Sequence, residues 1–200
     1  TIMGLDDRIG KAFLKAGPGY GGSCFPKDSK ALHQSFQQQA LSAPLISQID
    51  RSNQVMFEFV ADKIAHLVKS ESQPVIGYLG VSFKATTDDI RESPAIHAIT
   101  SLLQKYHHYQ IKIYDPQALA KAKSKLGQAV TYADNYQSLF SGSDLVCLFT
   151  EWEEFKNLPY QQLITLMKKP IFFDSRNLLE PQKMQALGFT YYGLGKANHN

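Results

Sequence analysis

One cysteine of this sequence, Cys24, has neighbours that could support nucleophilic chemistry. Cys24 follows a glycine-rich stretch, residues 17–22, and precedes Pro26. Glycine permits positive φ and lets backbone amides approach a ligand, whereas proline suits the first turn of a helix because its φ is fixed and it has no amide hydrogen. The loop is therefore expected to deliver the Cys24 thiol to the start of a helix.

The neighbours of Cys24 suit a reactive thiol. A helix N-terminus and the cation of Lys27 both favour the thiolate, which is the nucleophilic form. Asp28 lies one helical turn further on, where a carboxylate could move a proton or orient a water molecule. A flexible loop with a structural cysteine fits the same residues, and the residue types alone leave the two interpretations evenly matched.

Helical patterns occupy the first part of the chain. A short helix is expected over residues 8–15, a second helix from about Pro26, and a long third helix over residues 45–69, whose apolar side chains recur at helical spacing. A polar linker, residues 70–74, follows. Residues 1–5 read as the interior of a helix without a cap, so the chain is expected to be an excised fragment.

Beyond residue 74, short apolar runs alternate with helical stretches. Strands are expected at residues 75–80, 111–114, 144–149, 171–174 and 190–192, and helices at residues 94–106, 118–126, 160–168 and 182–187. Such alternation indicates a parallel sheet covered by helices on both faces. The predicted fold class is α/β, with a helical central segment (residues 1–72) followed by a Rossmann-like parallel-sheet domain (residues 73–200).

The composition is that of a folded protein with a small basic excess. Of the 200 residues, 44% are hydrophobic and 20% charged, and the net charge of +3 fits small anionic ligands but is too weak to indicate nucleic acid. Two cysteines favour a reducing compartment, so we expect a cytoplasmic protein. The sequence has no apolar run near the roughly 18 residues of a membrane span. The six histidines lack ligand spacing, so no metal site is predicted.

Several stretches, in order, resemble the UDP-glucose/GDP-mannose dehydrogenase family of nucleotide-sugar 6-dehydrogenases. The run Gly-Tyr-Gly-Gly-Ser-Cys-Phe-Pro-Lys-Asp, residues 19–28, is similar to the family's catalytic-cysteine signature, and residues 7–15 resemble the segment before it. Residues 80–94 resemble the start of the family's C-terminal nucleotide-binding domain. Further matches lie at residues 114–116, 150–152 and 174–177. The resemblance covers nearly the whole chain.

The resemblance implies an NAD-dependent enzyme that oxidises the C6 alcohol of a sugar nucleotide twice, giving a uronic acid. Cys24 is then the nucleophile that forms a thiohemiacetal and a thioester, and Asp28 assists water or proton transfer. Lys27 and Arg91 are implied to contact the cofactor. UDP-glucose is the implied substrate; GDP-mannose, or a non-catalytic nucleotide-binding or dimerisation module, is the alternative.

The same resemblance assigns residues that grip the sugar nucleotide. They are Arg8, Lys15, Gly17, Gly19, Tyr20, Gly21, Phe83, Lys84 and Arg176. Arg8 is implied to reach the substrate of a neighbouring subunit, which goes with a homodimer built on the long helix. Without the motif, Lys84 would read as a solvated lysine at a strand end and Arg91 as an ion-pair partner of Asp88 or Asp89.

Other residues are expected to be structural, and one motif is missing. Asp115 is interpreted first as a turn former, and Trp152 and Cys147 as core residues. The chain has no Gly-x-Gly-x-x-Gly after a strand, since Gly77 and Gly80 have the wrong spacing. The family's NAD-binding domain is therefore expected to lie outside this chain, which by itself is predicted to be inactive.

Overall fold

The centre of the molecule is a parallel six-stranded sheet in the order β3-β2-β1-β4-β5-β6, seen in a computed structural model that describes residues 2–11 and 14–196. Its strands are β1 (Val75–Leu79), β2 (Gln110–Tyr114), β3 (Thr131–Tyr132), β4 (Leu145–Leu148), β5 (Ile171–Asp174) and β6 (Thr190–Gly193). This order is that of a Rossmann-like α/β fold, so the predicted fold class is confirmed. The order reverses between β1 and β4, and in folds of this kind ligands bind beyond the carboxyl ends of the strands at such a point.

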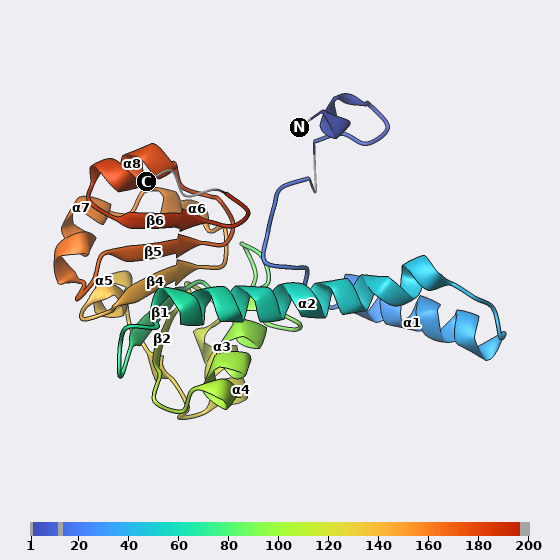
Figure 1. Cartoon of the computed structure of the whole chain (residues 1–200), viewed down its shortest axis with the longest axis horizontal. Helices are drawn as coiled ribbons and strands as arrows, with labels where there is room; N and C mark the ends of the chain where they lie inside the picture. Colours follow the sequence, from blue (N-terminus) through green and yellow to red (C-terminus); the bar gives the residue numbers. More distant parts are fainter. Residues whose placement is uncertain (1, 12–13, 197–200) are drawn as a thin grey trace.

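Helices cover both faces of the sheet (Figure 1). The helices beyond the linker are α3 (Pro94–Lys105), α4 (Leu119–Leu126), α5 (Tyr136–Phe140), α6 (Glu153–Lys156), α7 (Tyr160–Leu163), the 3-10 helix η2 (Ile164–Leu166) and α8 (Pro181–Ala186). Strand β4 is buried along its whole length because it lies between these layers, and this explains its uninterrupted apolar sequence. Two separate apolar clusters, one on each face, form the core.

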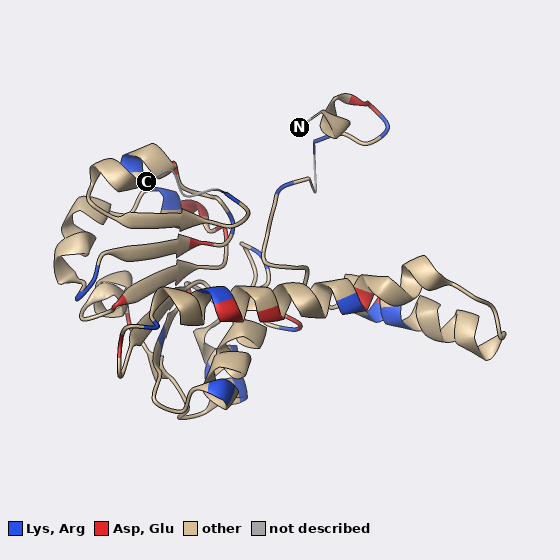
Figure 2. Cartoon of the chain, in the orientation of Figure 1, with Lys and Arg blue, Asp and Glu red and all other residues tan. Residues whose placement is uncertain are grey.

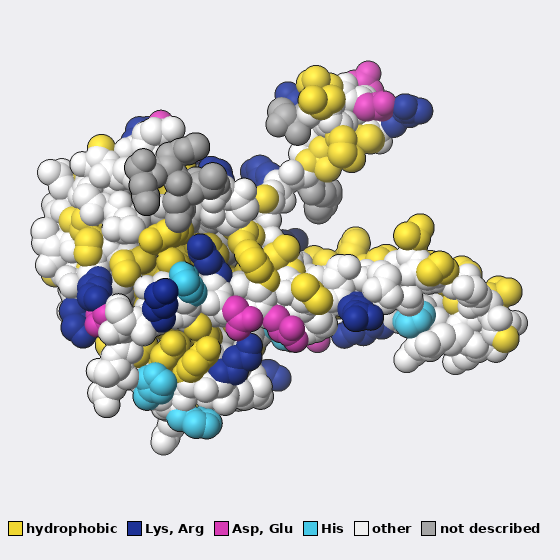
Figure 3. All heavy atoms as spheres, viewed as in Figure 1, with side chains coloured by type: hydrophobic (Ala, Val, Ile, Leu, Met, Phe, Trp, Pro, Cys, Tyr) yellow, Lys and Arg dark blue, Asp and Glu magenta, His cyan; other side chains and the backbone are white. Residues whose placement is uncertain are grey.

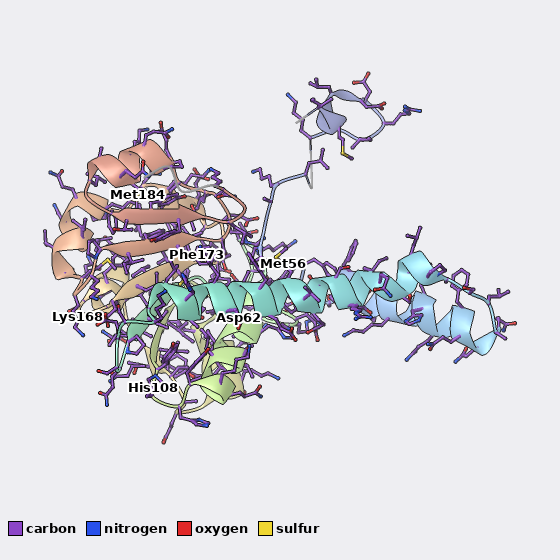
Figure 4. All side chains as sticks on the ribbon, in the orientation of Figure 1. Met56, Asp62, His108, Lys168, Phe173 and Met184 are labelled. Carbon is purple, nitrogen blue, oxygen red and sulfur yellow. The ribbon has the colours of Figure 1, made fainter. Side chains whose placement is uncertain are left out.

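Two helices before the sheet form a projecting hairpin, made of α1 (Cys24–Gln38) and α2 (Pro44–Leu67) (Figure 1). The C-terminal half of α2 also packs against α3, and its Val60 and Ile64 belong to the same apolar cluster as Phe173 of β5. Figure 4 labels Met56 of α2 and Phe173, which both belong to this packing. The long predicted helix therefore contributes to the core of the sheet domain.

The helix predicted over residues 8–15 is wrong for the residues that the structure describes. Residues 7–9 form a turn that follows a 3-10 helix, η1 (Met3–Leu5), and residues 12–13 lie outside the described part. The Asp6 carboxylate accepts hydrogen bonds from the amide of Arg8 at 3.0 Å and from its guanidinium at 2.8 Å. Gly10 adopts a left-handed φ of 70°. These local bonds compete with helical ones.

Several short elements escape the sequence prediction. Strand β3 has two residues and α5 has five, too few to show a period. The helix predicted over residues 160–168 is instead α7 followed by η2. Helix α1 begins at Cys24, two residues before the proline expected to start it.

Candidate active site

The glycine-rich loop, residues 17–22, passes between α2 and the segment that follows β1. On the α2 side, the Tyr20 amide donates to Asn53 Oδ1 at 2.9 Å, and Asn53 Nδ2 donates to the Tyr20 carbonyl at 2.9 Å. Gly19 has a φ of 107°, and a Cβ there would lie 2.7 Å from the ring of Phe57. Only glycine fits that position, in conformation and in space.

On its other side the loop meets residues 83–92 by backbone contact. The Gly22 amide donates to the Arg91 carbonyl at 2.8 Å. Gly22 has a φ of 90°, and a Cβ there would lie 2.7 Å from the Phe83 ring. The loop that precedes the cysteine is thus held between α2 and the first loop of the sheet domain.

Cys24 stands at the end of this loop as the first residue of α1, and its side chain is exposed. Its Sγ lies 3.7 Å from Ser23 Oγ. Asp28 follows four residues later on the same helix, so both side chains share one helix face. Lys27 forms an exposed ion pair with Asp28 at 3.4 Å. The structure therefore brings the thiol, the carboxylate and the lysine together at one helix N-terminus.

Arg91 lies close to this thiol. Its guanidinium forms an ion pair with Asp89 at 2.6 Å. This is one of the two partners that the sequence offered for Arg91. The hydrogen bonds that this guanidinium donates to the Asp89 carboxylate raise the pKa of Arg91, and its Coulombic interaction with Cys24 acts in the same direction. A groove of about 660 Å³ begins here. Its walls are formed by residues of α1 and the two residues before it, of α3, of α4 and of the loop between β1 and α3: Gly22, Ser23, Pro26, Lys27, Lys30, Ile90, Arg91, Glu92, Ser93, Ile96, His97, Thr100 and Lys125.

Arg176 joins the loops that follow three strands. From its position after β5, its Nε donates to the Phe149 carbonyl after β4 at 2.7 Å, and its Nη2 donates to the Phe83 carbonyl after β1 at 3.0 Å. Burial lowers the pKa of this guanidinium, and Glu151 lies 3.2 Å away. A Cβ on Gly17 would lie 3.1 Å from Arg176 Nη1. Arg176 therefore stands at the carboxyl edge of the sheet, facing the glycine loop.

Three other predicted site residues are exposed. Lys84 follows Phe83, with its Nζ 5.4 Å from that ring's centroid. Arg8 pairs with Asp6 at 2.8 Å and its side chain is 88% exposed. Lys15, between Arg8 and the glycine loop in the sequence, is exposed as well. The segment that carries Arg8 stands away from the sheet and the hairpin (Figure 1), so the structure does not bring Arg8 to the other site residues of its own chain.

Asn53 was missed by the sequence reasoning, although a signal was present. It interrupts the apolar face of α2 between Ile49 and Phe57 at helical spacing, and it is only 9% exposed. A buried amide on an apolar helix face requires partners, and here both partners belong to the glycine loop. The polar interruption could have pointed to this contact.

Three residues have the structural roles expected of them. Asp115 is buried and accepts hydrogen bonds from the amides of Val81 at 2.7 Å and Ala118 at 2.8 Å, so it ties the turn after β2 to the end of β1. Trp152 packs in the second apolar cluster. Cys147 is fully buried, and burial raises the pKa of its thiol well above the ordinary value.

Within residues 2–11 and 14–196, no three His, Cys, Asp or Glu side chains are grouped so that they could hold a metal ion. None of the helices in that part of the chain is long and apolar enough to cross a membrane.

A doubly wound parallel sheet, with a glycine loop packed against the loops that follow β1 and β5, is an architecture that commonly binds nucleotides. The UDP binding domain of the UDP-glucose/GDP-mannose dehydrogenase family matches residues 77–181, and the central domain of the same family matches residues 1–55. The chain belongs to the UDP-glucose/GDP-mannose dehydrogenase family.

Individual relatives agree with this. The UDP-glucose 6-dehydrogenase of Rickettsia bellii is 40% identical over 195 residues, which cover 96% of this chain and 44% of that protein. The UDP-glucose 6-dehydrogenase TuaD of Bacillus subtilis is 37% identical over 194 residues, 97% of this chain and 42% of that protein. The solved structure of a UDP-glucose dehydrogenase from Pyrobaculum islandicum superposes with a TM-score of 0.83 at 30% identity, over 98% of this chain and 42% of that one. The chain spans less than half the length of these relatives.

Proposed function

We propose that this chain forms the part of an NAD-dependent UDP-glucose 6-dehydrogenase that carries the nucleophile and holds the substrate's nucleotide. UDP-glucose would be oxidised to UDP-glucuronate in two hydride transfers. The observation that carries the proposal is the exposed Cys24 thiol at the start of α1, beside Arg91 and at the end of a glycine loop held on both sides. The proposed domains are residues 1–72 and 73–200, with α2 packing across the boundary.

The chemistry explains why a thiol is needed. The first oxidation at C6 gives an aldehyde, which has no hydroxyl group. It cannot lose a second hydride and proton until a nucleophile adds to its carbonyl carbon. The Cys24 sulfur adds to the carbonyl carbon, and the oxygen takes a proton to give a thiohemiacetal. Loss of a hydride and a proton converts this into a thioester. Water then attacks the thioester, Asp28 assists the proton transfer, and the acid and the free thiol are released.

The groove near Cys24 presents two cations, which suit the anionic NAD that a domain outside this chain would chiefly hold. Lys27 and Arg91 line it, and it has a volume of about 660 Å³. NAD, when bound, accepts a hydride in each oxidation. The two cations would hold its phosphates, with Arg91 oriented by its ion pair to Asp89.

The substrate would lie at the carboxyl edge of the sheet. Arg176 faces Gly17 there, and Phe83 and Lys84 follow the end of β1. We propose that Arg176 and Lys84 balance the substrate's phosphates, with backbone groups of Lys15, Gly17, Gly19 and Gly21 around it. Tyr20 would contribute by holding the shape of the loop, because its amide and carbonyl are bonded to Asn53 and its hydroxyl to Asp50.

The hairpin supports a homodimer. Residues 31–49 contain no Lys, Arg, Asp or Glu, and Figure 2 shows this part of the hairpin without charged residues. Leu41 and Leu45 are 59% and 84% exposed on it, and Phe59 further along α2 is 54% exposed. Figure 3 shows apolar side chains along this projection. An apolar projection of this kind is typical of a protein interface, and we propose that a second copy covers it and receives Arg8 in its site.

The test uses the full-length protein, including the region that precedes this chain. Two NADH formed per UDP-glucose, abolished by Cys24→Ala and retained in Cys147→Ala, would support the proposal. Two NADH with GDP-mannose alone would keep the mechanism and change the substrate. If no sugar nucleotide gives NADH, the chain would be a binding or dimerisation module. The 200-residue chain by itself is expected to form no NADH.

A further inference from the structure

Both polar atoms of the Asn53 side-chain amide form hydrogen bonds with one residue, Tyr20, of the glycine-rich loop. Asn53 lies on the buried face of α2 and is 9% exposed. Its Oδ1 accepts from the Tyr20 amide and its Nδ2 donates to the Tyr20 carbonyl, both at 2.9 Å. A side-chain amide that pairs with both groups of one residue fixes that residue's position and the direction of its backbone, much as a neighbouring strand would.

A second residue of α2, one turn earlier, extends this attachment to the other side of the cysteine. Asp50 Oδ1 accepts from the Tyr20 hydroxyl at 2.8 Å and from Ser29 Oγ at 2.9 Å. Ser29 belongs to α1 and directly follows Asp28. Tyr20 before Cys24 and Ser29 after it are therefore both bonded to a single turn of α2. The C-terminal half of α2 is in turn packed in the core of the sheet domain.

The space around this contact leaves little freedom. A Cβ on Gly19 would lie 2.6 Å from Asn53 Oδ1, so the loop packs directly against the amide. Cys24 is exposed, and within residues 2–11 and 14–196 its sulfur has a hydrogen-bond contact with Ser23 alone, so the backbone of the loop sets the position of the thiol.

We propose that Asn53 is a positioning residue for the nucleophile: by fixing Tyr20 it sets the placement of Cys24 relative to the sugar's C6. The inference rests on the proposed function, in which Cys24 acts only after the first oxidation. Displacement of the loop should therefore slow capture of the aldehyde more than formation of the aldehyde, and some aldehyde should escape.

The experiment uses the full-length protein with UDP-glucose and NAD. Asn53→Asp has the same shape and keeps the acceptor for the Tyr20 amide, but it places a second carboxylate oxygen against the Tyr20 carbonyl. We expect its overall kcat to fall roughly tenfold, with NADH per sugar consumed dropping from two toward one and aldehyde trapped by hydroxylamine. Asn53→Ala should behave alike. Gln54→Ala, an exposed neighbour on the same helix, should match the wild type.

The outcomes separate this inference from the proposed function. Two NADH per sugar at the wild-type rate in Asn53→Asp would overturn the inference, and so would an equal loss of both oxidations without trapped aldehyde. If Asn53→Ala does not fold, as judged by its melting curve, Asn53→Asp carries the test. If the wild type forms no NADH at all, the proposed function fails. In that case the role of Asn53 is judged from the rate of Cys24 alkylation. If Asn53 positions the thiol, this rate should differ between Asn53→Asp and the wild type by roughly threefold or more.

Discussion

The backbone of Gly21 lies directly against the carbonyl oxygen of Glu92, so that a Cβ at Gly21 would overlap this oxygen. Next to it, the Gly22 amide donates to the Arg91 carbonyl at 2.8 Å. Glu92 itself has a left-handed φ of 49°. The cysteine loop and the first loop of the sheet domain thus touch backbone to backbone, and a side chain at Gly21 would separate them.

Gly21→Ala should therefore destabilise the protein and loosen the cysteine loop. The obstacle is a backbone carbonyl, which cannot rotate away as a side chain could, and we expect a loss of about 1 to 3 kcal/mol in the free energy of unfolding. Urea titration followed by circular dichroism measures it. Gly142→Ala is the matched control, because a Cβ there meets nothing within 4 Å and costs only the strain of a left-handed φ of 68°. Equal losses in the two variants would contradict the contact.

Arg176 is expected to matter for stability as well as for substrate. Its guanidinium satisfies the carbonyls of Phe83 and Phe149 at once, a fork that the single ammonium of lysine cannot reproduce. Both Arg176→Lys and Arg176→Ala should lower the free energy of unfolding by about 2 to 3 kcal/mol, because a buried carbonyl loses its partner. Lys183→Ala, which breaks an exposed ion pair with Glu180, should leave the midpoint of unfolding unchanged. A lysine variant as stable as the wild type would show that the fork is dispensable.

The two cysteines should differ in access and in reactivity. Cys24 is exposed and Cys147 is fully buried. We expect iodoacetamide at neutral pH to label one thiol per native chain and two in urea, with no native labelling in Cys24→Ala. Labelling of Cys24 faster than that of a free cysteine peptide would indicate activation by the helix N-terminus. A slower rate would favour the non-catalytic module.

Much of this fold could be predicted from local patterns. The buried strands β1, β4 and β5 show as continuous apolar runs because helices cover both faces of the sheet. Cys24 at a helix start followed from glycines and a nearby proline, which act within a few residues. The elements that failed were too short to show a period, such as β3, or were overruled by a local bond, such as that between Asp6 and Arg8.

The site itself depends on contacts between distant residues, which residue types alone do not specify. Asn53 meets Tyr20 across 33 positions of sequence, and Arg176 meets Phe83 across 93. Arg176 was assigned from its motif as a ligand of the substrate, but nothing in the sequence indicates that two of its nitrogens bind backbone carbonyls. Such contacts follow from the order of strands in the sheet, which brings the loops after β1, β4 and β5 together.

The exposed apolar residues of the hairpin give a test of the homodimer. Leu45→Glu places a charge on a side chain that is 84% exposed, so it should cost the folded chain little while disrupting an apolar interface. We expect sedimentation to show a dimer for the wild type and a mass near the 22.4 kDa of one chain for the variant. Gln185→Glu adds the same charge at an exposed position of α8, outside the hairpin, and serves as the control for charge alone. A wild-type chain that sediments as a monomer at micromolar concentration would contradict the dimer.

Burial of Cys147 predicts how stability depends on alkaline pH. Its thiol is fully buried in β4, and burial raises its pKa well above the ordinary value. In the unfolded chain the thiol ionises at about pH 8.5, whereas in the folded chain the thiol keeps its proton to higher pH. The unfolded state therefore binds fewer protons in this range, and the stability present below about pH 8.5 should fall as pH rises, by up to about 1.4 kcal/mol per pH unit.

Cys147→Ala should flatten that slope between about pH 8.5 and pH 10, the interval that precedes ionisation of an unfolded tyrosine. Urea unfolding at several pH values measures it, and slopes are compared rather than levels because the cavity left by the sulfur lowers stability at every pH. Tyr78 is also fully buried, and burial raises the pKa of its hydroxyl too. Tyr78→Phe should therefore keep the slope in this interval and reduce the further fall at higher pH, to which the buried Tyr160 and Tyr191 also contribute because burial raises the pKa of their hydroxyls. An unchanged slope in Cys147→Ala would mean that the buried thiol does not govern alkaline stability.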